Sequence, residues 1–159
     1  MTALRLTVSL IFPPTRGFSP ESRKAVADAR RSAAAEIRLA LNDVRRRGRA
    51  AGPRRTGALR RSLRVRRERA IEPGAVTLSV TASPFYASFT NERGAARGWW
   101  DDAVGEIDHE LVRIGRGVAE RLASVFLREL ARDFIRGVRQ DLSGSRRVRG
   151  PGLAFYLVN

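Results

Sequence analysis

The stretch Arg55-Thr56-Gly57-Ala58-Leu59-Arg60-Arg61-Ser62-Leu63 lies where the hydrophobic period of the chain changes, and it therefore decides the fold. Thr56-Gly57 predicts a turn or a single helical turn at this junction. Before it, residues 20–47 carry apolar side chains at steps of three or four, the period of an amphipathic helix. After it, apolar residues and arginines alternate up to Arg67, which predicts a strand with one basic, solvated face.

The helix predicted over residues 20–47 has a clear start and a clear stop. Ser19 fits an N-cap and Pro20 fits the first helical position. Residues 48–53 end the helix and form a loop. Its apolar face consists of Val26, Ala29, Ala33, Ile37, Leu41 and Val44.

Two further segments alternate with the period of a half-buried strand. Residues 4–12 form the first and are ended by Pro13-Pro14, and residues 76–82 form the second. The turn signal Glu72-Pro73-Gly74 makes the second segment antiparallel to the strand that ends at Arg67.

A long apolar stripe predicts a second long helix over residues 101–142, with a kink or break at Gly115-Arg116-Gly117. The stripe consists of Ile107, Leu111, Ile114, Val118, Leu122, Phe126, Leu130, Phe134, Val138 and Leu142. Residues 143–152 read as a basic linker by composition, and residues 153–158 are an apolar arm. Because terminal residues fray unless they are tied down, this arm either adds a strand to its own sheet or docks on another subunit.

A chain of 159 residues is long enough for one domain with a real core. The predicted fold class is α+β, with a small antiparallel sheet packed against two long helices. This single domain covers residues 1–142. The basic linker and the extended C-terminal arm cover residues 143–159.

Twelve arginines and a single acid, Glu68, lie between Arg45 and Arg69, which gives +11 of the formal net charge of +15. Such a concentration of guanidinium groups points to a polyanionic partner, or to assembly beside one. A GC-rich genome would also explain the preference for arginine over lysine, but it would not explain the clustering. The absence of cysteine excludes disulfides and thiolate metal sites. No segment approaches the roughly 20 apolar residues of a membrane span, so we expect a soluble intracellular protein with no membrane partner.

One dense acidic group could carry chemistry: Asp101, Asp102, Glu106, Asp108 and Glu110, with the sole histidine, His109, among them. On a single helix Asp102, Glu106 and Glu110 would share a face and could hold a divalent cation, as in a metal-dependent nuclease. Acids at a helix start also complement the helix dipole, which is the more ordinary interpretation. The glycines lack the spacing of a phosphate-binding loop, so we expect no catalysis, no metal and no cofactor.

Trp99-Trp100 are the only tryptophans, and they precede the second long helix. Exposed rings at this point could stack on bases or anchor an interface. Adjacent tryptophans at the start of a helix more often divide, so we expect one ring in the core and one half-exposed.

The order of these motifs resembles the neck and tail-completion proteins of tailed bacteriophages, which are minor tail components also found in prophages and gene-transfer agents. Members share an Arg-Thr-Gly-x-Leu-x-x-Ser-Ile motif, then a Tyr-Ala segment leading into Glu-x-Gly, and then Pro-Phe-Leu before a long C-terminal helix. The matching residues here are Arg55–Leu63, Tyr86-Ala87 and Glu92-x-Gly94, whereas Trp99-Trp100-Asp101 replaces Pro-Phe-Leu. The resemblance covers residues 54–142.

The resemblance implies a virion structural protein of the head-to-tail junction or upper tail, found in the virion and, during assembly, in the host bacterial cytoplasm. Such proteins form homo-oligomeric rings, usually of six or twelve copies, on the DNA path. Their neighbours are connector, tail-terminator or tail-tube proteins. They are not enzymes and need no cofactor.

The resemblance, the clustered charge and the apolar C-terminal segment together assign roles to residues of this chain. The framework residues would be Thr56, Gly57, Leu59, Ser62, Leu63, Tyr86, Ala87, Phe89 and Gly94. Candidates for the DNA path or for ring contacts are Arg55, Arg60, Arg61, Arg64, Arg66 and Arg67. The candidate inter-subunit arm is Leu153, Phe155, Tyr156 and Leu157. Two other classes stay open, a free nucleic-acid-binding or DNA-packaging protein and a metal-dependent nuclease.

Overall fold

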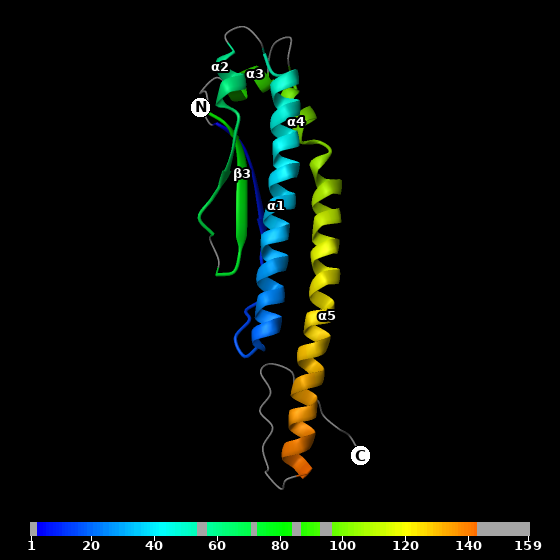
Figure 1. Ribbon diagram of the computed structural model, residues 1–159. Helices are drawn as coiled ribbons and strands as arrows, with labels where there is room; N and C mark the ends of the chain where they lie inside the picture. The colour runs from blue at the N-terminus through cyan, green and yellow to red at the C-terminus, as the bar shows by residue number, and fades with distance from the viewer. Residues whose placement is uncertain (1–2, 54–56, 71–72, 84–86, 93–96, 143–159) are drawn as a thin grey trace.

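The computed structural model describes residues 3–53, 57–70, 73–83, 87–92 and 97–142, the last six of them as backbone. The predicted α+β class is confirmed: two long helices run antiparallel, side by side, and a small antiparallel sheet packs against one of them (Figure 1). In chain order the elements are β1 (Leu4–Leu10), α1 (Pro20–Ala51), α2 (Ala58–Ser62), β2 (Arg64–Arg67), β3 (Val76–Ala82), α3 (Ala87–Glu92), α4 (Trp99–Val104) and α5 (Ile107–Leu142).

The sheet has the strand order β1-β3-β2, and both outer strands pair antiparallel with β3. The predicted pairing of the last two strands is therefore confirmed, and the N-terminal strand takes the other edge of β3. Gly74 turns the chain into β3 with a φ of 88°. A Cβ there would lie 2.9 Å from the carbonyl oxygen of Phe12, so this turn requires glycine.

Helix α1 begins as predicted and ends later than predicted. Ser19 is the N-cap, and its Oγ accepts a hydrogen bond from the backbone N–H of Ser22 at 3.2 Å. The helix does not stop at residue 47 but continues to Ala51. Gly48 lies inside the helix, and Leu63 and Trp99 pack against it so closely that a Cβ there would be 3.4 Å from a carbon atom of each. Packing of these two side chains against α1 outweighs the low helix propensity of glycine.

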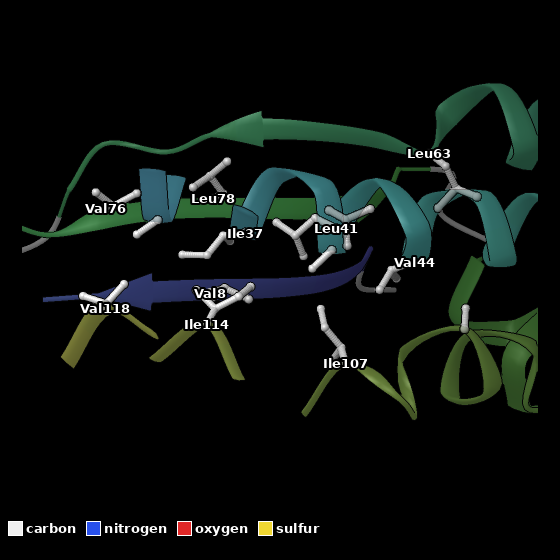
Figure 2. Packing of buried hydrophobic residues seen from close by; sticks show 14 of the residues in the cluster. Val8, Ile37, Leu41, Val44, Leu63, Val76, Leu78, Ile107, Ile114 and Val118 are labelled. Carbon is white, nitrogen blue, oxygen red and sulfur yellow. The ribbon is translucent and has the colours of Figure 1, made fainter. Parts of the chain in front are cut away.

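The hydrophobic core lies between α1, the sheet and the first half of α5. All six residues of the predicted apolar face of α1 are buried, and Ile37 and Leu41 are among the least exposed side chains of the described chain. Figure 2 shows these two beside Val8 and Leu78 of the sheet, with Ile114 on the α5 side of the cluster. Helix α1 thus lies between the sheet and α5 and contacts both.

The predicted helix over residues 101–142 is in fact two helices. The break lies at Gly105 and Glu106, between α4 and α5, and not at the predicted glycines. Gly115 and Gly117 stay helical because the neighbouring Ile114 and Val118 are buried in the core. Tertiary packing again decides where a glycine interrupts a helix.

The apolar stripe predicted along the second helix does not stay buried. A step of four residues advances about 400° around a helix, so each step turns the stripe by about 40°. Between Val118 and Phe134 four such steps rotate the stripe by about 160°. Val118 is accordingly 5% exposed, whereas Leu130 is 43% and Phe134 71% exposed. The C-terminal part of the apolar stripe is therefore exposed in the described chain.

Other side chains of α5 hold the start of α1. Phe18 packs edge-to-face on Phe126, with ring centroids 5.7 Å apart. The hydroxyl of Ser19, the N-cap of α1, donates to Glu129 Oε1 at 2.6 Å, and the Ser19 backbone N–H lies 3.3 Å from both carboxylate oxygens. We call this group the N-cap latch; it comprises Phe18, Ser19, Phe126, Glu129 and Arg132.

Glu129 is the carboxylate at the centre of the N-cap latch and is only 5% exposed. Its second partner is Arg132, whose Nη1 lies 3.2 Å from Oε2 and whose Nη2 donates to the carbonyl oxygen of Gly17. The hydrogen bond from Ser19, supported by the charge of Arg132, holds the pKa of Glu129 below its ordinary value. The buried group is therefore a carboxylate at neutral pH, placed at the positive end of the α1 dipole.

Candidate polyanion-binding surface

The described part of the sequence motif forms the junction between α1 and the sheet. Gly57 caps α2 with a φ of 64°, a left-handed conformation that favours glycine. Leu59 and Leu63 are 2% and 0% exposed, as expected of framework residues. Ser62 Oγ donates to the carbonyl oxygen of Leu59 at 2.7 Å. This junction anchors the start of β2 to the core, and it thereby sets where the arginines of β2 lie on the sheet.

Side chains on the face of the sheet turned away from α1 are all polar. On β2, Arg64 pairs with Thr81 of β3 and Arg66 pairs with Ser79, while Val65 between them packs against the core. We call this face the outer sheet face; it comprises Arg5, Thr7, Ser9, Arg64, Arg66, Glu68, Thr77, Ser79 and Thr81. On this face, three guanidinium groups and one carboxylate surround a layer of hydroxyl side chains.

Glu68 is the carboxylate of the outer sheet face and is bound in place. Ser79 Oγ donates to its Oε1 at 2.5 Å, and Arg5 Nη2 lies 2.9 Å from the same oxygen. The Ser79 hydrogen bond, with the charges of Arg5 and Arg66, lowers the pKa of Glu68. The carboxylate thus stays ionised and neutralises one of the three arginines. The outer sheet face keeps a net positive charge that can attract phosphates without reading bases.

Arg67 lies on the opposite side of β2 from Arg64 and Arg66. It is opposite Leu78 of β3 and lines a cleft of about 940 Å³ beside the N-terminal half of α1. Three more arginines and apolar side chains line the same cleft: Arg23, Arg30 and Arg31, with Phe12, Val26 and Val76. No carboxylate is among its lining residues, so this cleft is a second basic surface within the described chain.

Arg60 and Arg61 lie at a third place, on α2 near the end of α1. Arg60 Nη2 is 3.4 Å from the carbonyl oxygen of Ala50, and Arg49 Nε donates to the carbonyl oxygen of Arg60 at 3.0 Å. The guanidinium of Arg61 lies over Gly57. The predicted arginines that the structure describes therefore do not form one surface: Arg64 and Arg66 share a face of the sheet, and the others lie elsewhere.

Sequence reasoning missed Arg5, which brings a third guanidinium to the outer sheet face from β1. Its alternating position in the N-terminal strand already indicated a solvated side chain. Only the strand order shows that Arg5 lies across β3 from Arg64, on the same face of the sheet. The predicted candidate Arg55 lies outside the described residues, as do Thr56, Tyr86, Gly94 and the arm residues Leu153, Phe155, Tyr156 and Leu157.

Two further framework assignments can be compared with the structure. Ala87, at the start of α3, is fully buried. Phe89 is 49% exposed, so its assignment to the framework is wrong. A helix of six residues turns one face to the core, and that face here begins with Ala87.

The acidic group does not form the predicted three-carboxylate face. The helix is interrupted at residues 105–106. Asp102 therefore lies on α4 and Glu110 on α5, with Glu106 between the two helices. Glu106 pairs with Arg47 at 2.6 Å, and Glu110 pairs with Arg113 at 2.5 Å. In the described part of the chain, no three His, Asp or Glu side chains come close enough together to hold a metal ion.

Both tryptophans are buried, which corrects the prediction that one ring would be half-exposed. Trp99 is 1% and Trp100 7% exposed, and their rings pack edge-to-face with centroids 5.7 Å apart. The backbone N–H of Trp100 donates to Asn91 Oδ1 at 2.8 Å, which fixes the start of α4. Neither ring is exposed enough to stack on a base.

Comparison with known proteins adds no relative to this description. Within the described residues, no helix is long and apolar enough to cross a lipid bilayer. Searches against protein-family models, curated proteins and solved structures find no match to this chain.

Proposed function

We propose that this chain is a structural protein of a tailed phage or phage-like particle, which forms a homo-oligomeric ring on the DNA path and joins or completes the tail. The observation that carries the proposal is the order of motifs, with Arg-Thr-Gly-x-Leu at residues 55–59 leading into a sheet and then a long C-terminal helix. In this role the chain has no catalytic activity and no cofactor. Connector, tail-terminator or tail-tube proteins are its neighbours in the particle.

The charge distribution supports the proposal. The outer sheet face presents Arg5, Arg64 and Arg66 above a layer of small hydroxyl side chains. Such a face attracts a phosphate backbone diffusely and allows it to slide. That is the behaviour needed of a wall along which DNA passes.

The test is deletion of the coding sequence from the phage or particle genome that carries it, followed by electron microscopy and complementation. We expect filled heads and tails that do not join, and rescue by the wild-type chain. A Gly57→Val variant should fail to rescue, because a β-branched side chain strains the left-handed conformation there. Normal particles after the deletion would refute the proposal.

The net positive charge of the outer sheet face also favours a second candidate, a free DNA-binding or DNA-packaging protein. The purified chain would then bind duplex DNA with a steep salt dependence. Changing Arg64 and Arg66 to Gln would reduce the slope of log K against log salt by about 2, or roughly 0.9 for each lost phosphate contact. The matched control changes Arg38 and Arg116 to Gln, since both are exposed on helices away from this face. If the control variant reduced the salt slope as much as the variant of Arg64 and Arg66, the outer sheet face would be excluded as the binding site.

A further inference from the structure

The C-terminal part of α5 carries an apolar surface that the described chain leaves uncovered. Leu127 is 67% exposed, Leu130 43%, Phe134 71% and Ile135 53%. We call these four residues the α5 stripe. Figure 1 shows the end of α5, coloured orange, extending past the first turn of α1, so α1 does not cover the last turns of this helix.

Two residues of the α5 stripe, Leu127 and Phe134, lie on the opposite side of the helix from Glu129, the carboxylate at the centre of the N-cap latch. Leu127 and Phe134 are offset by about 160° from Glu129 and Val125 at about 100° per residue, and those two residues are buried. The side of α5 that could pack on α1 is therefore already used. A helix projecting from its domain with four large apolar side chains in solvent is marginal by itself and marks an interface.

The chain itself contains a second apolar segment, which is long enough to span this surface. After α5 it continues for residues 143–159, which lie outside the described residues. A linker rich in Gly, Ser and Arg, residues 143–152, leads to the apolar sequence Leu-Ala-Phe-Tyr-Leu-Val at residues 153–158. In extended form such a hexapeptide spans about 20 Å. The α5 stripe, from residue 127 to residue 135, is about 12 Å long.

The linker is long enough to reach a neighbouring molecule. Ten residues span up to about 33–36 Å. Helices that pack side by side are only about 8–10 Å apart. The linker directly follows Leu142, the last residue of α5.

We propose that residues 153–158 of one copy cover the α5 stripe of the next copy, a contact that rests on the ring of the proposed function. The segment that is donated, residues 153–158, and the surface that receives it, the α5 stripe, are different parts of the same chain. Such a head-to-tail contact closes into a ring when the rotation between neighbours allows it. In such a ring each copy gives an arm to one neighbour and receives an arm from the other.

Two full-length variants test the contact by sedimentation velocity. The stripe variant carries Leu130→Ser and Phe134→Ser and cannot receive an arm. The arm variant carries Phe155→Ser and Leu157→Ser and cannot donate one. Each alone should associate at least about a hundredfold more weakly than the wild type, since an anchor residue is worth about tenfold or more. Mixed in equal amounts, they should form a one-to-one complex that grows no further, because one intact arm meets one intact stripe.

A control variant separates this contact from a general loss of apolar surface. Leu39→Ser with Val112→Ser removes two side chains that are 67% and 63% exposed but lie outside the α5 stripe. This variant should assemble like the wild type. Far-UV circular dichroism and the one-to-one complex together show that the stripe variant is folded.

Three results would overturn the inference. A monomeric wild type would mean that the arm folds back on its own helix. An arm variant that still assembles would mean that the α5 stripe meets another surface, such as a second stripe. A mixture that stays monomeric would exclude exchange between copies. A one-to-one complex combined with normal particles after gene deletion would uphold the contact and reject the proposed function.

Discussion

Replacing Glu129 with glutamine should reduce the free energy of unfolding by about 2 kcal/mol, because it removes the charge at the centre of the N-cap latch. The carboxylate accepts from the hydroxyl and the backbone N–H of Ser19 and pairs with Arg132. A hydrogen bond to a charged group contributes about 1.5–3 kcal/mol and a neutral one about 0.5–1.5, so each Ser19 bond weakens by about 1 kcal/mol. The amide also loses its attraction to the α1 dipole, about 0.3–1 kcal/mol.

The assay is urea unfolding at a fixed protein concentration, repeated between pH 7 and pH 3. The pKa of Glu129 is lowered in the folded state, so its contribution is complete above the unfolded value of about 4.3. The contribution is lost as the pH falls through the lower, folded pKa. The gap between wild type and Glu129→Gln should therefore be constant above about pH 5 and close towards pH 3.

The control is Glu120→Gln, an exposed carboxylate on the same helix, which should change stability by less than about 0.5 kcal/mol. If Glu129→Gln behaved like this control, the N-cap latch would not stabilise the fold. If the gap persisted unchanged at pH 3, its cause would be packing and not charge.

Three further changes follow from the packing and need only urea unfolding. Gly117→Ala should stabilise the chain by about 0.5–1 kcal/mol, because its Cβ would meet nothing within 4 Å in the middle of α5; a loss of stability would contradict this. Gly52→Ala should destabilise it by about 1–3 kcal/mol, because its Cβ would lie 2.7 Å from the carbonyl oxygen of Gly48; an unchanged midpoint would show that the end of α1 relaxes. Leu41→Ala, at a fully buried position, should cost about 2–5 kcal/mol, and a cost below about 1 would exclude it from the core.

Local periodicity predicts most of the elements of this fold. Leu4–Leu10, Val76–Ala82 and the start of α1 follow directly from alternation, from steps of three or four and from the Ser19-Pro20 cap. The end of α1 and the break before α5 do not follow, because both depend on glycines. Gly48 is helical and Gly105 is not, and the difference lies in the side chains that pack on Gly48 from elsewhere in the chain.

The candidate surface is less predictable than the fold. The run of arginines shows that charge is concentrated, but the sheet distributes Arg64 and Arg67 to opposite faces. The third guanidinium, Arg5, and the partner that binds Glu68, Ser79, come from other strands. Only the strand order brings these residues together, and strand order is not a local property of sequence.

The pairing of β1 with β3 has a consequence for synthesis on the ribosome. Ser9 and Thr77, whose hydroxyls lie 3.0 Å apart in the sheet, are separated by 68 residues of chain. At about 5–20 residues per second the ribosome needs about 3–14 s to make that length, and β1 has no partner strand during this time. Arg5 lies in the middle of this waiting apolar strand, and a charge there disfavours pairing with the edge of another nascent chain. The arginine that binds Glu68 in the folded sheet thus also places a charge in β1 before its partner strand has been made.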